Sequence, residues 1–222
     1  MSVENSSPAV MMPTVPSKQI RRWLGWIVLA LVVGGAAAGA FLAYQYYFNH
    51  TFNAGLVSPV EQAPDFTLTD QTGKPFKLSD SKGKWILMAY GYTTCPDVCP
   101  ATLAILGRVQ ELLGEDADRI QVIFVTVDPE RDTPTKMGEY VNHFGEGTIA
   151  LTGTAEEIAA AAQPYGVRYA RVEMPESALV YAMNHTAFIY LITPEFEWTM
   201  VYPFGITAPE IADDLQFLIN QE

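Results

Sequence analysis

Charged side chains are absent from a long stretch near the N-terminus. No Asp, Glu, Lys or Arg occurs from Trp23 to Val60, and a helix needs only about 20 apolar residues to cross a bilayer. Lys18, Arg21 and Arg22 precede this stretch, so the positive-inside rule places the short arm before it in the cytoplasm and everything after it on the other side. A cleaved signal peptide is the alternative, because residues 38–40 resemble a cleavage site. Both readings predict a folded part outside the cytoplasm.

Cysteine and histidine are scarce. The 222 residues include two cysteines, Cys95 and Cys99, and three histidines, His50, His143 and His185. A disulfide between the two cysteines would close a very short loop, which adds only about 2 kcal/mol to stability. A purely structural disulfide therefore explains the two cysteines poorly, and a reactive or metal-binding role explains them better.

Basic residues are also few. Lys and Arg number 13 against 25 Asp and Glu, for a formal net charge of −12. The acidic excess falls after residue 22, because the arm before it holds three basic residues and only Glu4. Nucleic acid and anionic membrane surfaces are thus excluded as partners of the folded part, and basic protein surfaces suit it better.

The chain divides into four predicted parts. We expect a cytoplasmic arm over residues 1–22, a transmembrane anchor over 23–48, a linker over 49–63 and one domain over 64–222. No internal repeat or low-complexity tract is visible in the sequence. A domain of this length fits the usual size of a single folding unit.

Hydrophobic periodicity predicts an α/β order within the domain. The expected elements are a hairpin over residues 65–80, buried strands over 85–92 and 120–128, a strand pair over 185–193 and 195–204, and helices over 100–113, 133–145, 154–166 and 208–220. A βαβ start, an antiparallel pair and a terminal helix are typical of a thioredoxin-like fold with an N-terminal hairpin. The single transmembrane helix precedes it.

The motif "GYTTCPDVCP" lies where a buried strand is followed by a helix. A thiol at a helix N-terminus has a lowered pKa and becomes a thiolate, which both disulfide exchange and metal ligation require. Three residues separate Cys95 from Cys99, whereas dithiol oxidoreductases usually have two. On a helical turn, positions i and i+4 share one face, so both sulfurs can bind one soft ion such as Cu(I) or zinc. The residues alone leave metal and redox chemistry open, and they do not settle which histidine, if any, is a third ligand.

Four stretches together resemble the Sco/SenC family of copper-binding cytochrome c oxidase assembly proteins. They are "APDFTLTDQTGKPF", "GYTTCPDVCP", "VTVDPERDTP" and "NHTAFIYLITP". The resemblance runs from about Pro64 to the C-terminus and includes the preceding anchor. It implies one copper ion per chain, Cu(I) or Cu(II), bound by Cys95, Cys99 and His185, with Asp128 close by to orient a ligand or modulate copper affinity.

The resemblance also implies a function and a location. It indicates a membrane-anchored metallochaperone that delivers copper to the CuA centre of cytochrome c oxidase subunit II and receives copper from another chaperone. We favour a bacterial inner membrane with a periplasmic domain over a mitochondrial one, because the short N-terminus makes a poor transit peptide. The family usually has Asp-His-Ser where this chain has Asn184-His185-Thr186, so a carboxylate that would tune the histidine is missing.

Other chemistries compete with copper delivery. A thiol-disulfide reductase would use Cys95 and Cys99 as attacking and resolving thiols, in either order, to keep the acceptor's cysteines reduced. Thioredoxin-like reductases place a cis-proline before the strand that follows His185, and no proline occurs between Pro175 and Pro194. A thiol peroxidase is disfavoured because no proline stands just before the cysteine motif. Zinc is the alternative metal for two thiolates and an imidazole.

Overall fold

The computed structural model describes residues 17–48, 50–145 and 147–221. The chain forms two units, Met1–Thr51 and Phe52–Glu222. The first contains one long helix, α1 (Ser17–Phe48), in which Arg22–Gln45 is long and apolar enough to cross a membrane. Residues 1–16 of the predicted cytoplasmic arm lie outside the described residues.

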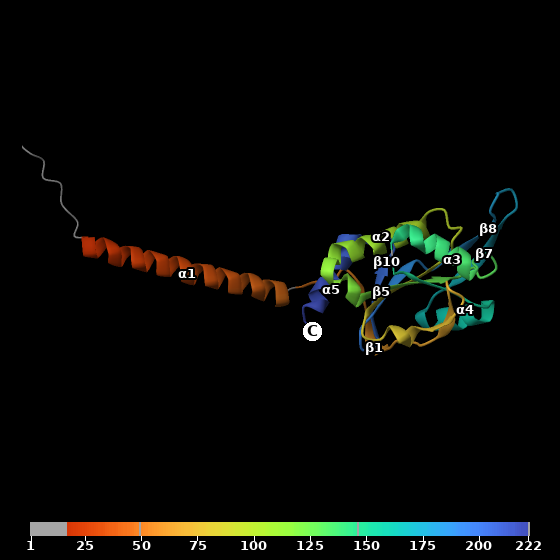
Figure 1. The fold of residues 1–222 in the computed structure, drawn as a ribbon, viewed down its shortest axis with the longest axis horizontal. Coiled ribbons are helices and arrows are strands. Elements are labelled where there is room, and N and C mark those ends of the chain that lie inside the picture. The colour runs from red at the N-terminus through yellow and green to blue at the C-terminus, as the bar shows by residue number, and fades with distance from the viewer. Residues whose placement is uncertain (1–16, 49, 146, 222) are drawn as a thin grey trace, which may run out of the picture. The chain divides into compact units, whose positions relative to one another are not determined.

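The second unit is a mixed α/β domain (Figure 1). An eight-stranded sheet has the order β1-β10-β9-β4-β5-β6-β2-β3, and β7 and β8 form a separate two-stranded sheet. The strands are β1 (Gly55–Gln62), β2 (Thr67–Asp70), β3 (Pro75–Lys77), β4 (Trp85–Gly91), β5 (Ile120–Thr126), β6 (Ile149–Thr152), β7 (Tyr169–Met174), β8 (Val180–His185), β9 (Phe188–Ile192) and β10 (Glu197–Pro203). The α-helices are α2 (Val98–Leu113), α3 (Pro134–Val141), α4 (Ala155–Ala162) and α5 (Ala208–Ile219).

The centre of the sheet is buried on both faces. Strand β4 is buried along its whole length and pairs in parallel with β5 and antiparallel with β9. On one face, Gly91 at the end of β4 lies against Cys99 of α2. On the other face, the Tyr90 hydroxyl donates a hydrogen bond to the Ala161 carbonyl of α4 at 2.9 Å. Helices on both faces explain why β4 and β5 are continuous apolar runs without polar alternation.

The predicted order of elements is confirmed for the hairpin, the two buried strands, the four helices and the late strand pair. The predicted linker is wrong in part, because Gly55–Gln62 forms the edge strand β1 and pairs with β10. An edge strand tolerates Pro59, which has no N–H to give to a ladder. The other predicted boundaries stay predictions.

Three further strands, β6, β7 and β8, have no counterpart in the prediction. Strand β6 is only four residues long. Strands β7 and β8 pair from Tyr169↔His185 to Met174↔Val180 and stand outside the main sheet. This pair, called the histidine hairpin below, ends at the histidine that the resemblance singled out.

Candidate metal centre

The two cysteines lie just beyond the carboxyl end of β4, in residues 92–99, called the cysteine loop below. Cys95 is in the loop itself, and Cys99 is in the first turn of α2. The expectation that a helical turn brings both sulfurs together is therefore corrected, because α2 begins only at Val98. The loop instead folds so that the Cys99 amide donates to the Cys95 Sγ at 3.4 Å. Both cysteines are free thiols.

The two sulfurs differ in protonation. The pKa of Cys95 is lowered to about 3, chiefly by a hydrogen bond with Cys99 and also by His185 and nearby backbone N–H groups, against an opposing effect of burial. The pKa of Cys99 is raised, because its proton serves Cys95 and because its side chain is desolvated. The metal-free pair is thus a half-buried thiolate next to a buried thiol. This asymmetry favours Cys95 as the nucleophile and Cys99 as the proton donor.

His185 reaches the cysteines from the end of β8 rather than from the apolar strand β9 that follows. Its Nε2 lies 3.5 Å from the Cys99 Sγ. Its Nδ1 lies 3.0 Å from the Thr186 carbonyl oxygen, and N–H donation to that oxygen leaves the Nε2 lone pair free. The edge of the Tyr92 ring contacts the imidazole at a centroid distance of 5.9 Å. The histidine is therefore oriented on two sides.

The structure brings three candidate ligands together. One ligand atom each from Cys95, Cys99 and His185 lies within 4.8 Å of the others. Two sulfurs and an imidazole nitrogen form a soft donor set that suits Cu(I), Cu(II) or zinc and disfavours Mg²⁺ and Ca²⁺. The donor chemistry therefore fits the predicted copper.

The other two histidines lie elsewhere. His143 is exposed at the end of α3, with its Nδ1 2.7 Å from the Glu139 carbonyl oxygen. This is a common role for histidine at a helix C-terminus. His50 belongs to the N-terminal unit, Met1–Thr51.

Asp128 is buried and is held by contacts with the histidine hairpin and with Arg131. Its carboxylate accepts a hydrogen bond from the Tyr181 hydroxyl at 2.8 Å and pairs with Arg131. Tyr181 is in β8, as His185 is. Asp128 therefore reaches the histidine through the hairpin, and its influence on a bound metal stays a prediction.

Residue reasoning missed several contacts that hold the site. The sequence offers Asp132 or Thr133 as the cap of α3, and in the structure Thr133 caps that helix by accepting from the Lys136 amide. Asp132 instead accepts from the Thr93 hydroxyl at 2.6 Å. Tyr92 was not singled out either. Their place in the sequence could have marked Tyr92 and Thr93 as site residues, because they directly follow a buried strand and precede the first cysteine.

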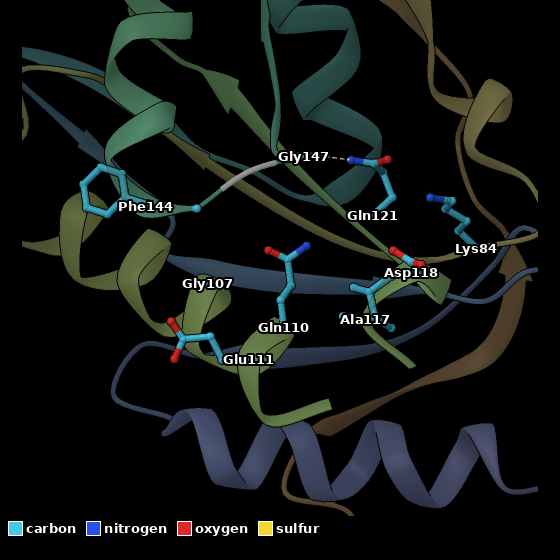
Figure 2. Close-up of a pocket in the computed structure, with 11 residues that line it drawn as sticks. Lys84, Gly107, Gln110, Glu111, Ala117, Asp118, Gln121, Phe144 and Gly147 are labelled. Carbon is cyan, nitrogen blue, oxygen red and sulfur yellow. Dashed lines mark hydrogen bonds between the residues drawn. The ribbon is translucent and has the colours of Figure 1, made fainter. Parts of the chain in front are cut away.

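One hollow of the domain is lined by none of these ligands, and Figure 2 shows its lining residues. A cavity of about 590 Å³ opens between α2, the start of β5 and the segment around Gly147. Its described lining includes Lys84, Glu111 and Asp118 but no cysteine or histidine. A smaller open hollow of about 340 Å³ is lined by His185 and by residues at the start of β7 and the end of β8. Of these two hollows, the smaller one is lined by a candidate ligand, His185.

Comparison with known proteins agrees with this geometry. The SCO1/SenC family model matches residues 46–220. The chain belongs to the SCO1/SenC family. The mitochondrial SCO2 homolog of Bos taurus is 33% identical over 196 residues, which are 86% of this chain and 73% of that protein.

Two solved structures of relatives have copper bound. Arabidopsis thaliana ScoI superposes with a TM-score of 0.68 at 32% identity and covers 73% of this chain and 100% of its own. Bradyrhizobium japonicum ScoI superposes with a TM-score of 0.64 at 38% identity and covers 70% of this chain and 98% of its own. The thioredoxin-like α/β fold predicted for this SCO1/SenC protein is thereby confirmed.

Proposed function

We propose that this chain is a membrane-anchored copper metallochaperone that helps deliver copper to the CuA centre of cytochrome c oxidase subunit II. One observation carries the proposal, namely the convergence of Cys95, Cys99 and His185 within 4.8 Å. Membership of the SCO1/SenC family supports it, as do the relatives whose structures hold copper. One copper ion per chain fits one such set of ligands.

Each ligand has a separate part in binding. Cys95 is already a thiolate in the metal-free protein. Cys99 must lose its proton to become a ligand, so binding releases a proton. Two thiolates alone satisfy Cu(I), whereas Cu(II) also needs the borderline nitrogen of His185. The histidine thus decides how well the site holds the oxidised ion.

Transfer proceeds by ligand exchange. Cys95 is half-buried and accessible, and the hollow of about 340 Å³ opens beside His185. An acceptor thiolate entering there replaces one protein ligand at a time, so copper is not released into solution. The acceptor is the cysteine-containing CuA domain, and the donor is another copper chaperone.

The N-terminal helix supplies the anchor in this proposal. Its apolar segment Arg22–Gln45 spans the bacterial inner membrane once, with residues 1–22 in the cytoplasm. The copper-binding domain is then periplasmic, where it meets the external face of the oxidase. Its acidic surface suits a basic partner and excludes nucleic acid.

An anaerobic copper titration of the full chain in detergent micelles tests the proposal. Wild type should bind one copper per chain with sulfur-to-copper charge-transfer bands in the Cu(II) form. Cys95→Ala and Cys99→Ala should each lose more than about 100-fold in copper affinity, since direct ligands matter more than the groups around them. His185→Ala should lose Cu(II) and keep Cu(I), and His143→Ala is the matched control. Absence of tight copper in wild type rejects the proposal.

A thiol-disulfide reductase is the second candidate, and the unequal thiols favour it. The Cys95 thiolate would attack an acceptor disulfide and form a mixed disulfide with release of one acceptor thiolate. Cys99 would then give up its proton and displace the second acceptor thiol, leaving a Cys95–Cys99 disulfide. Reduction of an oxidised CuA domain by His185→Ala separates the roles. Undiminished reduction with abolished copper delivery shows that both activities exist, and no reduction by wild type excludes this one.

A further inference from the structure

Residues 128–132, between β5 and α3, contain two of the few buried charges of the domain. The side chains of Asp128 and Asp132 are 3% and 0% exposed. Burying a carboxylate is costly unless hydrogen bonds and a cation compensate it. The partners of the two carboxylates therefore show which parts of the domain this segment holds.

Asp132 holds the cysteine loop. Its carboxylate accepts from the Thr93 amide at 3.0 Å and from the Thr93 hydroxyl at 2.6 Å. It also accepts from the Thr126 hydroxyl at 2.7 Å, at the end of β5. Thr93 stands two residues before Cys95, so these bonds tie the start of the cysteine loop to a core strand.

Arg131, the adjacent residue, holds the histidine hairpin. Its Nη1 donates to the carbonyls of Leu179 and Tyr181 at 3.2 and 3.0 Å. Its guanidinium lies 3.7 Å from the centroid of the Tyr181 ring, close enough for a cation–π interaction. Asp128 completes the unit, because it pairs with Arg131 and accepts from the Tyr181 hydroxyl.

The other attachments of the hairpin are side-chain contacts: an exposed ion pair between Arg171 and Glu130 at 3.0 Å, the contact of Tyr92 with His185, and the packing of Tyr169 and Met183 against the core. The hairpin pairs only with itself in the described sheets, and Val172, Met174 and Val180 are 41%, 39% and 57% exposed. Tyr181 is buried at 7%, and it lies four residues before His185 on the same face of β8. The Arg131 anchor therefore acts on the part of the hairpin that carries the histidine.

We infer that Arg131 and Asp132 are positioning residues that hold the two halves of the metal centre separately, Arg131 the histidine hairpin and Asp132 the cysteine loop. The inference rests on the proposed function for its copper readouts only. Neither residue is a ligand. The two anchors are inferred to act independently, so loss of one anchor moves one group of ligands and leaves the other in place.

Hydrogen–deuterium exchange on the metal-free full chain in detergent micelles tests the inference without copper. Arg131→Gln should speed amide exchange in residues 169–185 by about tenfold, because a charge-assisted anchor of the hairpin is lost. Exchange in residues 92–99 and in β4 should stay as in wild type. Arg108→Gln, which removes an exposed ion pair with Glu111 on α2, is the matched control.

Loss of Arg131 leaves Asp128 buried without its cation and can unfold the chain. The double variant Asp128→Asn/Arg131→Gln removes that charge together with its partner. It should fold and show the same hairpin-limited increase in exchange. Unchanged exchange in the hairpin of the folded double variant overturns the role assigned to Arg131.

A matched pair of substitutions tests the other half. Thr93→Val removes the hydroxyl that Asp132 accepts from, and Thr93→Ser keeps it. Thr93→Val should speed exchange in residues 92–99 by about tenfold and leave residues 169–185 unchanged, while Thr93→Ser should match wild type. Equal effects of the two variants, or an effect that spreads to both halves, overturns the role assigned to Asp132.

Copper spectra then connect the anchors to the proposed function. The double variant should have an affinity for Cu(II) about tenfold lower than wild type and shifted charge-transfer bands, while its affinity for Cu(I) stays within about threefold of wild type. Thr93→Val should lower the affinity for both Cu(I) and Cu(II). If wild type binds no copper, the proposed function fails while the exchange experiment still decides the inference. If wild type binds copper but the double variant keeps its Cu(II) spectrum, the inference fails alone.

Discussion

The cysteine loop and the histidine hairpin bring their ligands to one point from very different surroundings. Cys99 is 2% exposed and packs in the main core beside the end of β4. The histidine hairpin is a two-stranded sheet of its own, with three large apolar side chains exposed at 39% or more. One half of the site is thus fixed by the core, and the other is attached to it through the polar contacts of Arg131 and Asp128 and the partly buried side chains of Tyr169 and Met183.

This difference suits the proposed function, in which the protein passes its copper to an acceptor. Regions with few buried contacts open locally at a low cost in free energy, whereas the core opens only on global unfolding. If copper binds as proposed, we therefore expect the imidazole of His185 to leave more easily than the buried sulfur of Cys99. Release by histidine-first exchange follows from the proposed function and this contrast in burial.

The largest effect should come from disturbing the rigid half. A Cβ at Gly91 would lie 2.8 Å from the Cys99 Sγ and 2.7 Å from the Phe124 ring, so only glycine fits. Gly91→Ala should lower the free energy of unfolding by about 1–3 kcal/mol, because overpacking a core forces atoms apart. It should also weaken Cu(I), since Cys99 must shift. Chemical denaturation and copper titration of the full chain measure the two effects.

Gly55→Ala is the control for this substitution. Its Cβ would meet Val201 of the edge pair at 3.4 Å, an ordinary contact. Stability and Cu(I) affinity close to wild type are expected there. If Gly91→Ala changed stability and Cu(I) affinity as little as Gly55→Ala, the cysteine half would be less tightly packed than its burial implies, and the contrast between the two halves would fail.

A smaller effect concerns the pH dependence of Cys95. The thiolate, not the thiol, reacts with iodoacetamide, and the pKa of Cys95 is lowered to about 3. Its alkylation rate in the metal-free chain should therefore be nearly flat from about pH 5 to pH 8. An ordinary thiol of pKa about 8.5 loses reactivity by about 10² to 10³ over this range. Mass spectrometry of the alkylated chain follows the rate.

Two variants show which half sets this reactivity. The hydrogen bond with Cys99 is the largest cause that lowers the pKa, and His185 is a lesser one. Cys99→Ala should therefore make the pH profile much steeper, and His185→Ala should change it less. The reverse order would place control of Cys95 in the hairpin and contradict the view that the cysteine half is self-contained.

The parts of the fold that sequence patterns predicted are those with strong periodicity. Strands β4 and β5 are continuous apolar runs, and helix α4 begins with a capping box formed by Thr154 and Glu157. Strand β1 was missed because it contains a proline and lies at an edge. Strands β7 and β8 were missed because they mix charged, small and apolar side chains without a clear alternation along the sequence.

The site was predictable in part for a related reason. The spacing of Cys95 and Cys99 indicated a shared ion, but the residues alone gave no ground to choose His185 over His143. That choice depends on where the hairpin folds back, which is a tertiary contact between β8 and residues 128–132. Local patterns do not encode such contacts, and only the family resemblance indicated His185, the histidine that the structure places near both cysteines.

The smallest effect is expected where this chain departs from its family. Asn184 is exposed, and alternation along β8 points its side chain away from the face that carries His185. Asn184→Asp adds one charge in high dielectric, which salt screens within about 10 Å. Cu(II) affinity should then change by less than about threefold and return toward wild type as salt is raised. A change of tenfold or more that persists at high salt would mean that residue 184 acts directly on the imidazole, so the hairpin would tune the metal as well as carry its third ligand.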